Sequence, residues 1–231
     1  EGRSQGRFSS GILIVPAISL SRLSQQSKRL SEKFAHPTAF LCELHHLLEF
    51  YTEGARRPGL SSMSTPLALH YGVRSPVLRL ISQSLTNHIA DNPSAALALC
   101  DALWLDQYFE CKWLAAAILG KISLKESALL LDRVKKWLAE KPEEQLVDAI
   151  LEKGCLGLRV RHSEDLVRII GEWLGAEDIF FRRCGLKGLQ SLASNPAFDN
   201  LPLCFRLLDD VIRGAFPNLR QELIDVLAVL A

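Results

Sequence analysis

The sequence lacks a hydrophobic run long enough to cross a membrane. The apolar stretch at residues 11–20 is only ten residues long and contains Pro16, whereas a membrane-spanning helix needs about 20 apolar residues. The segment before it is basic and rich in serine. We expect residues 1–36 to form an N-terminal extension with at most one helix, and we expect no membrane partner.

The cysteines lack the spacing of a disulfide framework or of a metal site. The six cysteines are scattered, with no C-x-x-C pair. His45 and His46 are adjacent on a predicted helix, so they cannot both face one metal ion. The sequence also lacks a P-loop, a dinucleotide fingerprint and the G-x-S-x-G motif of hydrolases. We therefore expect free thiols, no metal, no cofactor and a reducing, cytoplasmic location.

The chain has almost no net charge, so it is not a nucleic-acid-binding protein with a large overall excess of basic residues. The formal net charge is +1, from 27 basic and 26 acidic residues. The charge is unevenly distributed, since residues 1–90 carry ten basic and five acidic side chains. A basic first third permits a polyanionic partner without requiring one, and a solvated surface of mixed sign explains it equally well.

From residue 37 onward the sequence contains a succession of amphipathic helical patterns and no convincing strand alternation. Apolar residues recur at three- and four-residue spacing, and turn residues recur every 12 to 20 positions. We expect helices to begin at Pro37, near Ser75, at Pro93 and near Ser163 and Asp178.

Two further segments bear on the helix boundaries. Residues 123–126 have the form of a capping box before the next helix. Residues 155–160 are ambiguous between helix and strand.

We expect these helices to form one all-α domain at residues 37–231, because no segment rich in glycine, proline or serine divides it. Roughly eleven helices with short loops fit two architectures. One is a helix bundle, and the other is a stack of helix hairpins in which neighbours bury each other's apolar faces. Periodicity alone does not choose between them.

Four motifs follow one another in a definite order. They are Tyr-Gly-Val-Arg-Ser-Pro at residues 71–76, Glu-Cys-Lys-Trp-Leu-Ala at 110–115, Leu-Val-Asp at 146–148 and Glu-Asp-Ile-Phe-Phe-Arg-Arg at 177–183. Their order and spacing resemble the DNA alkylation repair family of HEAT-like DNA glycosylases. The resemblance covers most of the chain from residue 37 and implies a HEAT-like (armadillo-type) superhelix of antiparallel helix pairs.

The resemblance also implies a chemistry without metal or cofactor. Members of this family release cationic N3- or N7-alkylated purines from duplex DNA, and a carboxylate stabilises the positive charge that develops on the sugar. Asp148 matches that catalytic carboxylate. This sequence departs from the family where aromatic residues flank the site, because it has Glu143 and Glu144 at one such position and Asp225 near another.

Arginines at the matching motif positions are the expected DNA contacts. Arg183 matches the arginine that faces the DNA in the family, and a salt bridge to Glu177 or Asp178 is the alternative role for it and its neighbour. The full set of expected DNA-binding residues is Arg74, Arg79, Arg159, Arg161, Arg182 and Arg183.

Two interpretations remain open. In the first, the protein is a monomeric DNA alkylation repair protein that binds duplex DNA on a concave basic surface. Hydrolysis of the N-glycosidic bond would then depend on Asp148. In the second, it is a non-catalytic helical-repeat scaffold for a protein or another ligand. The four tryptophans lie at apolar periodic positions and are expected in the core.

Overall fold

The structure, a computed structural model, describes residues 19–52, 69–195, 198, 200–214 and 216–230. Within these residues the fold is all-α, as predicted, and the only strand-like feature is an isolated parallel bridge between Leu69 and Tyr108. The elements are α1 (Leu20–Ser31), α2 (Pro37–Tyr51), α3 (Ser75–Ser84), α4 (Thr86–Asp91), α5 (Pro93–Trp104), α6 (Phe109–Leu119), α7 (Ala128–Ala139), α8 (Glu144–Asp148), the π-helical turn η1 (Ala149–Gly154), α9 (Leu156–Arg161), α10 (Ser163–Leu174), α11 (Ile179–Ala193), α12 (Leu201–Arg213), the 3₁₀ turn η2 (Pro217–Leu219) and α13 (Arg220–Leu230).

Proline and capping residues set several of the helix starts. Pro37 and Pro93 each occupy the first helical position, where the missing N–H costs nothing. Asp178 accepts a hydrogen bond from the Phe180 backbone N–H at the start of α11, which confirms the expected start there.

The capping box expected at residues 123–126 is wrong. Helix α7 begins at Ala128, and the residue before it is Ser127. The Ser127 hydroxyl does not cap α7, because it donates to Asp165 Oδ2 on α10 at 2.5 Å. A tertiary partner therefore takes the hydroxyl that local sequence would use for capping. The ambiguous segment at residues 155–160 is largely helical and belongs to α9.

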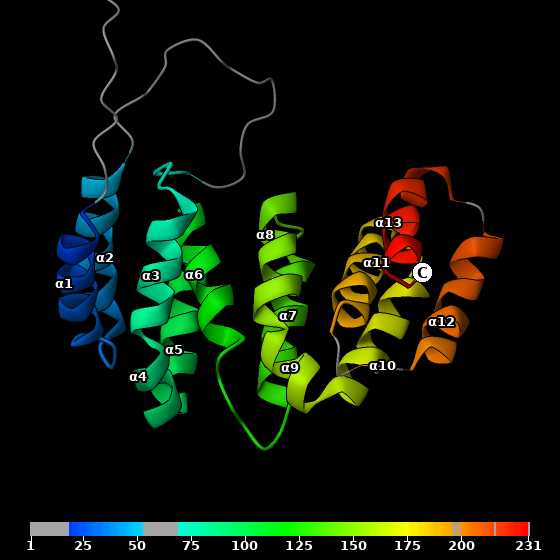
Figure 1. Ribbon diagram of the computed structural model, residues 1–231, viewed down its shortest axis with the longest axis horizontal. Helices are drawn as coiled ribbons and strands as arrows, with labels where there is room; N and C mark the ends of the chain where they lie inside the picture. The colour runs from blue at the N-terminus through cyan, green and yellow to red at the C-terminus, as the bar shows by residue number, and fades with distance from the viewer. Residues whose placement is uncertain (1–18, 53–68, 196–197, 199, 215, 231) are drawn as a thin grey trace, which may run out of the picture.

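The helices follow one another along the long axis of the molecule, from α1 at one end to α12 and α13 at the other (Figure 1). One row contains α1, α3, α6, η1, α11 and α13, each packed on the next. The other row contains α2, α5, α10 and α12, and α5 and α10 connect the rows by packing on α6 and α11. Helix α7 is joined to α5 by the stacked rings of Trp104 and Trp137 and to α10 by the ion pair of Lys135 with Glu172. Stacking in chain order agrees with a helical-repeat array rather than a closed bundle.

One continuous hydrophobic core runs between the rows, from Leu23 of α1 to Val226 of α13. Trp104 and Trp137 lie in it with their rings stacked 4.4 Å apart, and Trp173 is also buried. Trp113 is only partly buried, with the Lys153 ammonium 5.3 Å from its ring centroid. The expected core role is thus met fully by three of the four tryptophans.

Helix α6 and the π turn approach each other unusually closely. A Cβ atom added to Gly120, at the end of α6, would lie 1.8 Å from the Lys153 carbonyl oxygen. The π turn is closed by the Cys155 N–H, which donates to the Ile150 carbonyl oxygen at 2.9 Å. Because η1 follows α8 directly, this contact fixes the end of α8, where Asp148 lies.

Candidate functional site

Asp148 is the last residue of α8, and its side chain is 44% exposed. Its Oδ1 atom lies 2.6 Å from Nζ of Lys187, on α11. The same ammonium lies 2.9 Å from Oε1 of Glu144. Lys187 therefore joins α8 to α11 and balances part of the negative charge of two carboxylates.

The Lys187 ammonium is well placed to stay charged. Its side chain is only 16% exposed, and burial alone would lower its pKa. Hydrogen bonds from Lys187 to Asp148 and Glu144 outweigh burial and raise that pKa above its ordinary value. In turn, the hydrogen bond from Lys187 lowers the pKa of Glu144.

A cleft of about 620 Å³ opens beside Asp148, between η1, α9, α11 and α13. Its charged lining consists of four carboxylates and two cations, so the cleft is acidic overall. These residues are Asp148, Glu152, Glu222, Asp225, Arg159 and Lys187. Asp225 therefore lines the same cleft as Asp148.

Glu143 and Glu144, the other departure, point to different partners. Glu143 Oε1 lies 3.3 Å from His70 Nε2, just before the Tyr-Gly-Val-Arg motif. Glu144 is 74% exposed and shares Lys187 with Asp148. The resemblance implies an aromatic residue at this position. In this protein a carboxylate faces solvent beside Asp148 instead.

Arg183 and Arg182 both contact other parts of the array. Arg183 Nε lies 2.5 Å from Oε1 of Glu222 on α13, and its Nη2 donates to the Asn218 carbonyl oxygen at 3.2 Å. Arg182 Nε donates to the Ala176 carbonyl oxygen at 2.5 Å, and its guanidinium lies 4.1 Å from the centroid of the Phe216 ring. Neither pairs with Glu177 or Asp178 among these contacts, and Asp178 forms an ion pair with Lys141 instead.

Arg159 and Arg161 bind backbone carbonyl groups. Arg159 donates to the Glu152 and Ser191 carbonyl oxygens at 2.6 and 3.3 Å, and burial lowers its pKa. Arg161 donates to the Ile122 carbonyl oxygen at 2.7 Å. Both arginines therefore stabilise chain segments around the site, and of the two only Arg159 lines the cleft.

Arg74 and Arg79 lie elsewhere on the array. Arg79 is exposed on α3, and no hydrogen bond or ion pair joins it to the residues that the structure describes. Arg74 is also exposed, directly before α3. The structure thus brings Asp148 and Arg159 to one cleft and Arg183 to a pocket of about 190 Å³ beside it, which also contains Glu144 and Lys187.

Two residues organise these motifs through contacts that the sequence did not predict. Lys187 lies outside the four motifs. It is four residues after Arg183 on α11 and therefore lies on the same helix face. Glu110 is 2% exposed and accepts hydrogen bonds from the backbone N–H groups of Tyr71, Gly72 and Val73 at 3.1, 2.8 and 3.3 Å. Its carboxylate thereby fixes the Tyr-Gly-Val-Arg motif on α6.

None of the helices in the described ranges is both long and apolar enough to span a bilayer. Comparison with family models identifies residues 60–214 as a match to the DNA alkylation repair enzyme family. No curated protein and no solved structure matches the chain. The match covers more than half of the 231 residues and contains the four motifs, Asp148 and Lys187. The chain belongs to the DNA alkylation repair enzyme family.

Proposed function

We propose that the protein binds duplex DNA containing cationic alkylated purines and hydrolyses their N-glycosidic bond, with Asp148 as the catalytic carboxylate. The observation that supports this most directly is that Asp148 lines a cleft and lies within the span that matches the family. Oδ1 of Asp148 binds Lys187, while Oδ2 has no hydrogen-bond partner among the described residues. That second oxygen is available to a sugar.

The reaction requires little besides charge stabilisation. An N3- or N7-alkylated purine carries a positive charge, so it leaves as a neutral base when the bond from C1′ breaks, and the positive charge moves to the sugar. A carboxylate close to C1′ lowers the energy of that cationic transition state. Water then adds to C1′ and loses a proton, which leaves an abasic site.

Lys187 has a defined part in this proposal. Its ammonium offsets the charge of Asp148 in the free protein, which weakens the carboxylate's effect on a sugar cation. A DNA phosphate near α11 would compete with Asp148 and Glu144 for the same ammonium. Lys187 would then bind the phosphate and leave more of the Asp148 charge for the sugar.

The test is base release from duplex DNA containing N7-methylguanine or N3-methyladenine. We expect release by the wild type and none by Asp148→Asn. Glu152→Gln is the matched control, because Glu152 is an exposed carboxylate on the wall of the same cleft, and it should retain activity. Equal release by wild type and Asp148→Asn would remove Asp148 from the chemistry.

A second candidate function is a non-catalytic helical-repeat scaffold for a protein or another ligand. The four carboxylates of the cleft, which include Asp225, favour it, since they repel phosphates. The exposed Glu144, where the resemblance implies an aromatic residue, favours it as well. Salt-dependent binding of unmodified duplex DNA separates the two. The DNA-repair proposal predicts binding that weakens with salt, and the scaffold predicts none.

A further inference from the structure

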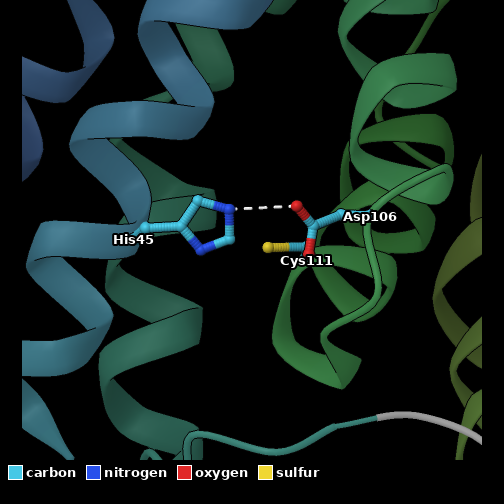
Figure 2. Close-up of side chains that lie close together, drawn as sticks. All are labelled: His45, Asp106 and Cys111. Carbon is cyan, nitrogen blue, oxygen red and sulfur yellow. Dashed lines mark hydrogen bonds and ion pairs between the residues drawn. The ribbon is translucent and has the colours of Figure 1, made fainter.

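Three side chains of metal-binding type converge far from Asp148. His45 extends from α2 toward Asp106, in the loop before α6, and toward Cys111, in the first turn of α6 (Figure 2). His45 Nε2 lies 3.0 Å from Asp106 Oδ2. The ligand atoms of the three residues all lie within 4.8 Å of one another.

Asp106 and Cys111 are held in place by the backbone around them. Oδ1 of Asp106 accepts a hydrogen bond from the Tyr108 N–H at 2.9 Å, which leaves Oδ2 directed at His45. The loop is anchored by Leu69, whose N–H donates to the Gln107 carbonyl oxygen at 3.0 Å and whose carbonyl oxygen accepts from the Phe109 N–H at 2.8 Å. Cys111 is fully buried. Two ligands are therefore preorganised on one side of the cluster.

The histidine ring is also oriented. His45 Nδ1 lies 2.8 Å from the Tyr71 hydroxyl, and the Tyr71 ring stacks on Tyr108 with centroids 4.1 Å apart. A tyrosine hydroxyl can donate or accept, so it suits either tautomer of the imidazole. When it accepts from Nδ1–H, the Nε2 lone pair is free for a metal ion. Metal-bound histidines are commonly oriented by such a hydrogen bond on the other ring nitrogen.

We propose that His45 Nε2, Asp106 Oδ2 and Cys111 Sγ bind one divalent transition-metal ion of the Zn²⁺ class, with water as the fourth ligand. One nitrogen, one thiolate sulfur and one carboxylate oxygen form a donor set that suits Zn²⁺ and disfavours Mg²⁺ and Ca²⁺. Zinc bonds of about 2.0–2.3 Å place tetrahedral ligand atoms roughly 3.3–3.7 Å apart. The present separations need only small side-chain shifts to reach that range.

The ion can reach the cluster from solvent. The side chains of His45 and Asp106 are 25% and 14% exposed, whereas Cys111 closes the inner side. An ion bound here would join α2 to the loop before α6, next to Tyr71 of the Tyr-Gly-Val-Arg motif. This proposal is independent of the glycosylase proposal, because none of these residues lines the cleft beside Asp148.

The test is a Co²⁺ titration of the full chain after chelation and reduction, followed by absorbance. We expect one equivalent of Co²⁺ to produce tetrahedral d–d bands and a thiolate-to-cobalt charge-transfer band, and Zn²⁺ to remove both. Cys111→Ser should lose the charge-transfer band, and His45→Gln should weaken binding about tenfold or more. Cys42→Ser is the matched control, because Cys42 is an exposed thiol on α2 outside the cluster, and it should behave as wild type.

The absence of a charge-transfer band in the wild type would overturn the proposal. So would a band that survives Cys111→Ser or binding that is unchanged in His45→Gln. The cluster would then be a hydrogen-bonded link between α2 and α6 alone. If Cys111→Ser does not fold, His45→Gln at its partly exposed position and the wild-type spectrum still decide the question.

Discussion

Lys187 is bound by two carboxylates, and this residue determines how much charge Asp148 can offer to a ligand. No sequence motif predicts the contacts of Lys187 with Asp148 and Glu144, because Lys187 is 39 residues from Asp148 in the chain. Asp148 itself was found from the Leu-Val-Asp motif. The sequence therefore indicates the carboxylate, while the structure supplies the cation that balances it.

Arg183→Ala tests the expected DNA contact on α11. We expect weaker DNA binding and a salt dependence reduced by about one phosphate contact, because one cation would leave the interface. Binding measured against salt concentration gives that slope. Arg168→Ala is the control, since Arg168 is an exposed arginine on α10, in the other row of helices. An unchanged salt dependence in Arg183→Ala would mean that Arg183 does not contact DNA and serves only to bind Glu222 and Asn218.

Glu144→Gln tests the ion pair with Lys187 through its pH dependence. The hydrogen bond from Lys187 lowers the pKa of Glu144 in the folded protein, so the pair stabilises the fold above the unfolded pKa of about 4.3. That contribution is lost as pH falls through the folded pKa. Because Glu144 is 74% exposed, the effect is small and screened by salt. The free energies of unfolding of wild type and Glu144→Gln, measured in urea, should differ at pH 7 and converge near pH 3. An equal difference at both pH values would mean that the ion pair with Lys187 does not stabilise the fold.

At the scale of elements, proline and helix-capping residues predicted helix starts, and tertiary contacts account for the errors. Pro37, Pro93 and Asp178 mark helix starts correctly because their effects are local. Ser127 escaped prediction because its hydroxyl binds Asp165 on another helix. The π turn after Asp148 was also not predicted, since it depends on the close contact between α6 and η1.

Gly120→Ala tests that close contact. A methyl group at residue 120 would overlap the Lys153 carbonyl oxygen at 1.8 Å, so α6 and η1 must move apart. We expect the free energy of unfolding to fall by about 2 kcal/mol or more, measured by urea denaturation. Gly175→Ala is the control, because the nearest atom to its added Cβ lies at 3.6 Å, an ordinary contact. Equal stability of the two variants would mean that the approach of α6 to η1 is looser than described.

At the scale of the whole molecule, hydrophobic periodicity predicts the all-α class but not the stacking order, which the family motifs supply. The site lies outside what periodicity can predict, because Asp148, Lys187 and Asp225 come from three different helices, α8, α11 and α13. The same holds for His45 and Asp106, which are 61 residues apart. Ligand spacing along the chain cannot detect a cluster formed by two distant segments.

Helix α1 gives a test of how far the array extends. It lies within the expected extension at residues 1–36, yet Leu30 is fully buried and α1 packs on α3. We expect Leu30→Ala to lower the free energy of unfolding by about 2–5 kcal/mol, because it leaves a cavity in the shared core. Leu20→Ala, at a side chain that is 67% exposed, should have little effect. If Leu30→Ala leaves the free energy of unfolding unchanged, α1 does not contribute to the stability of the array.

If the Asp148 carboxylate faces positive charge on a bound sugar, the protein should bind a cationic sugar analogue more tightly than a neutral one. Duplex DNA with a cationic pyrrolidine in place of one sugar mimics the transition state, and a neutral tetrahydrofuran abasic site is its matched ligand. We predict that the wild type prefers the cationic duplex by roughly tenfold, about 1.4 kcal/mol, and that Asp148→Asn binds both duplexes equally. Equal binding of both duplexes by the wild type, or a preference that Asp148→Asn retains, would mean that Asp148 does not stabilise charge on the sugar.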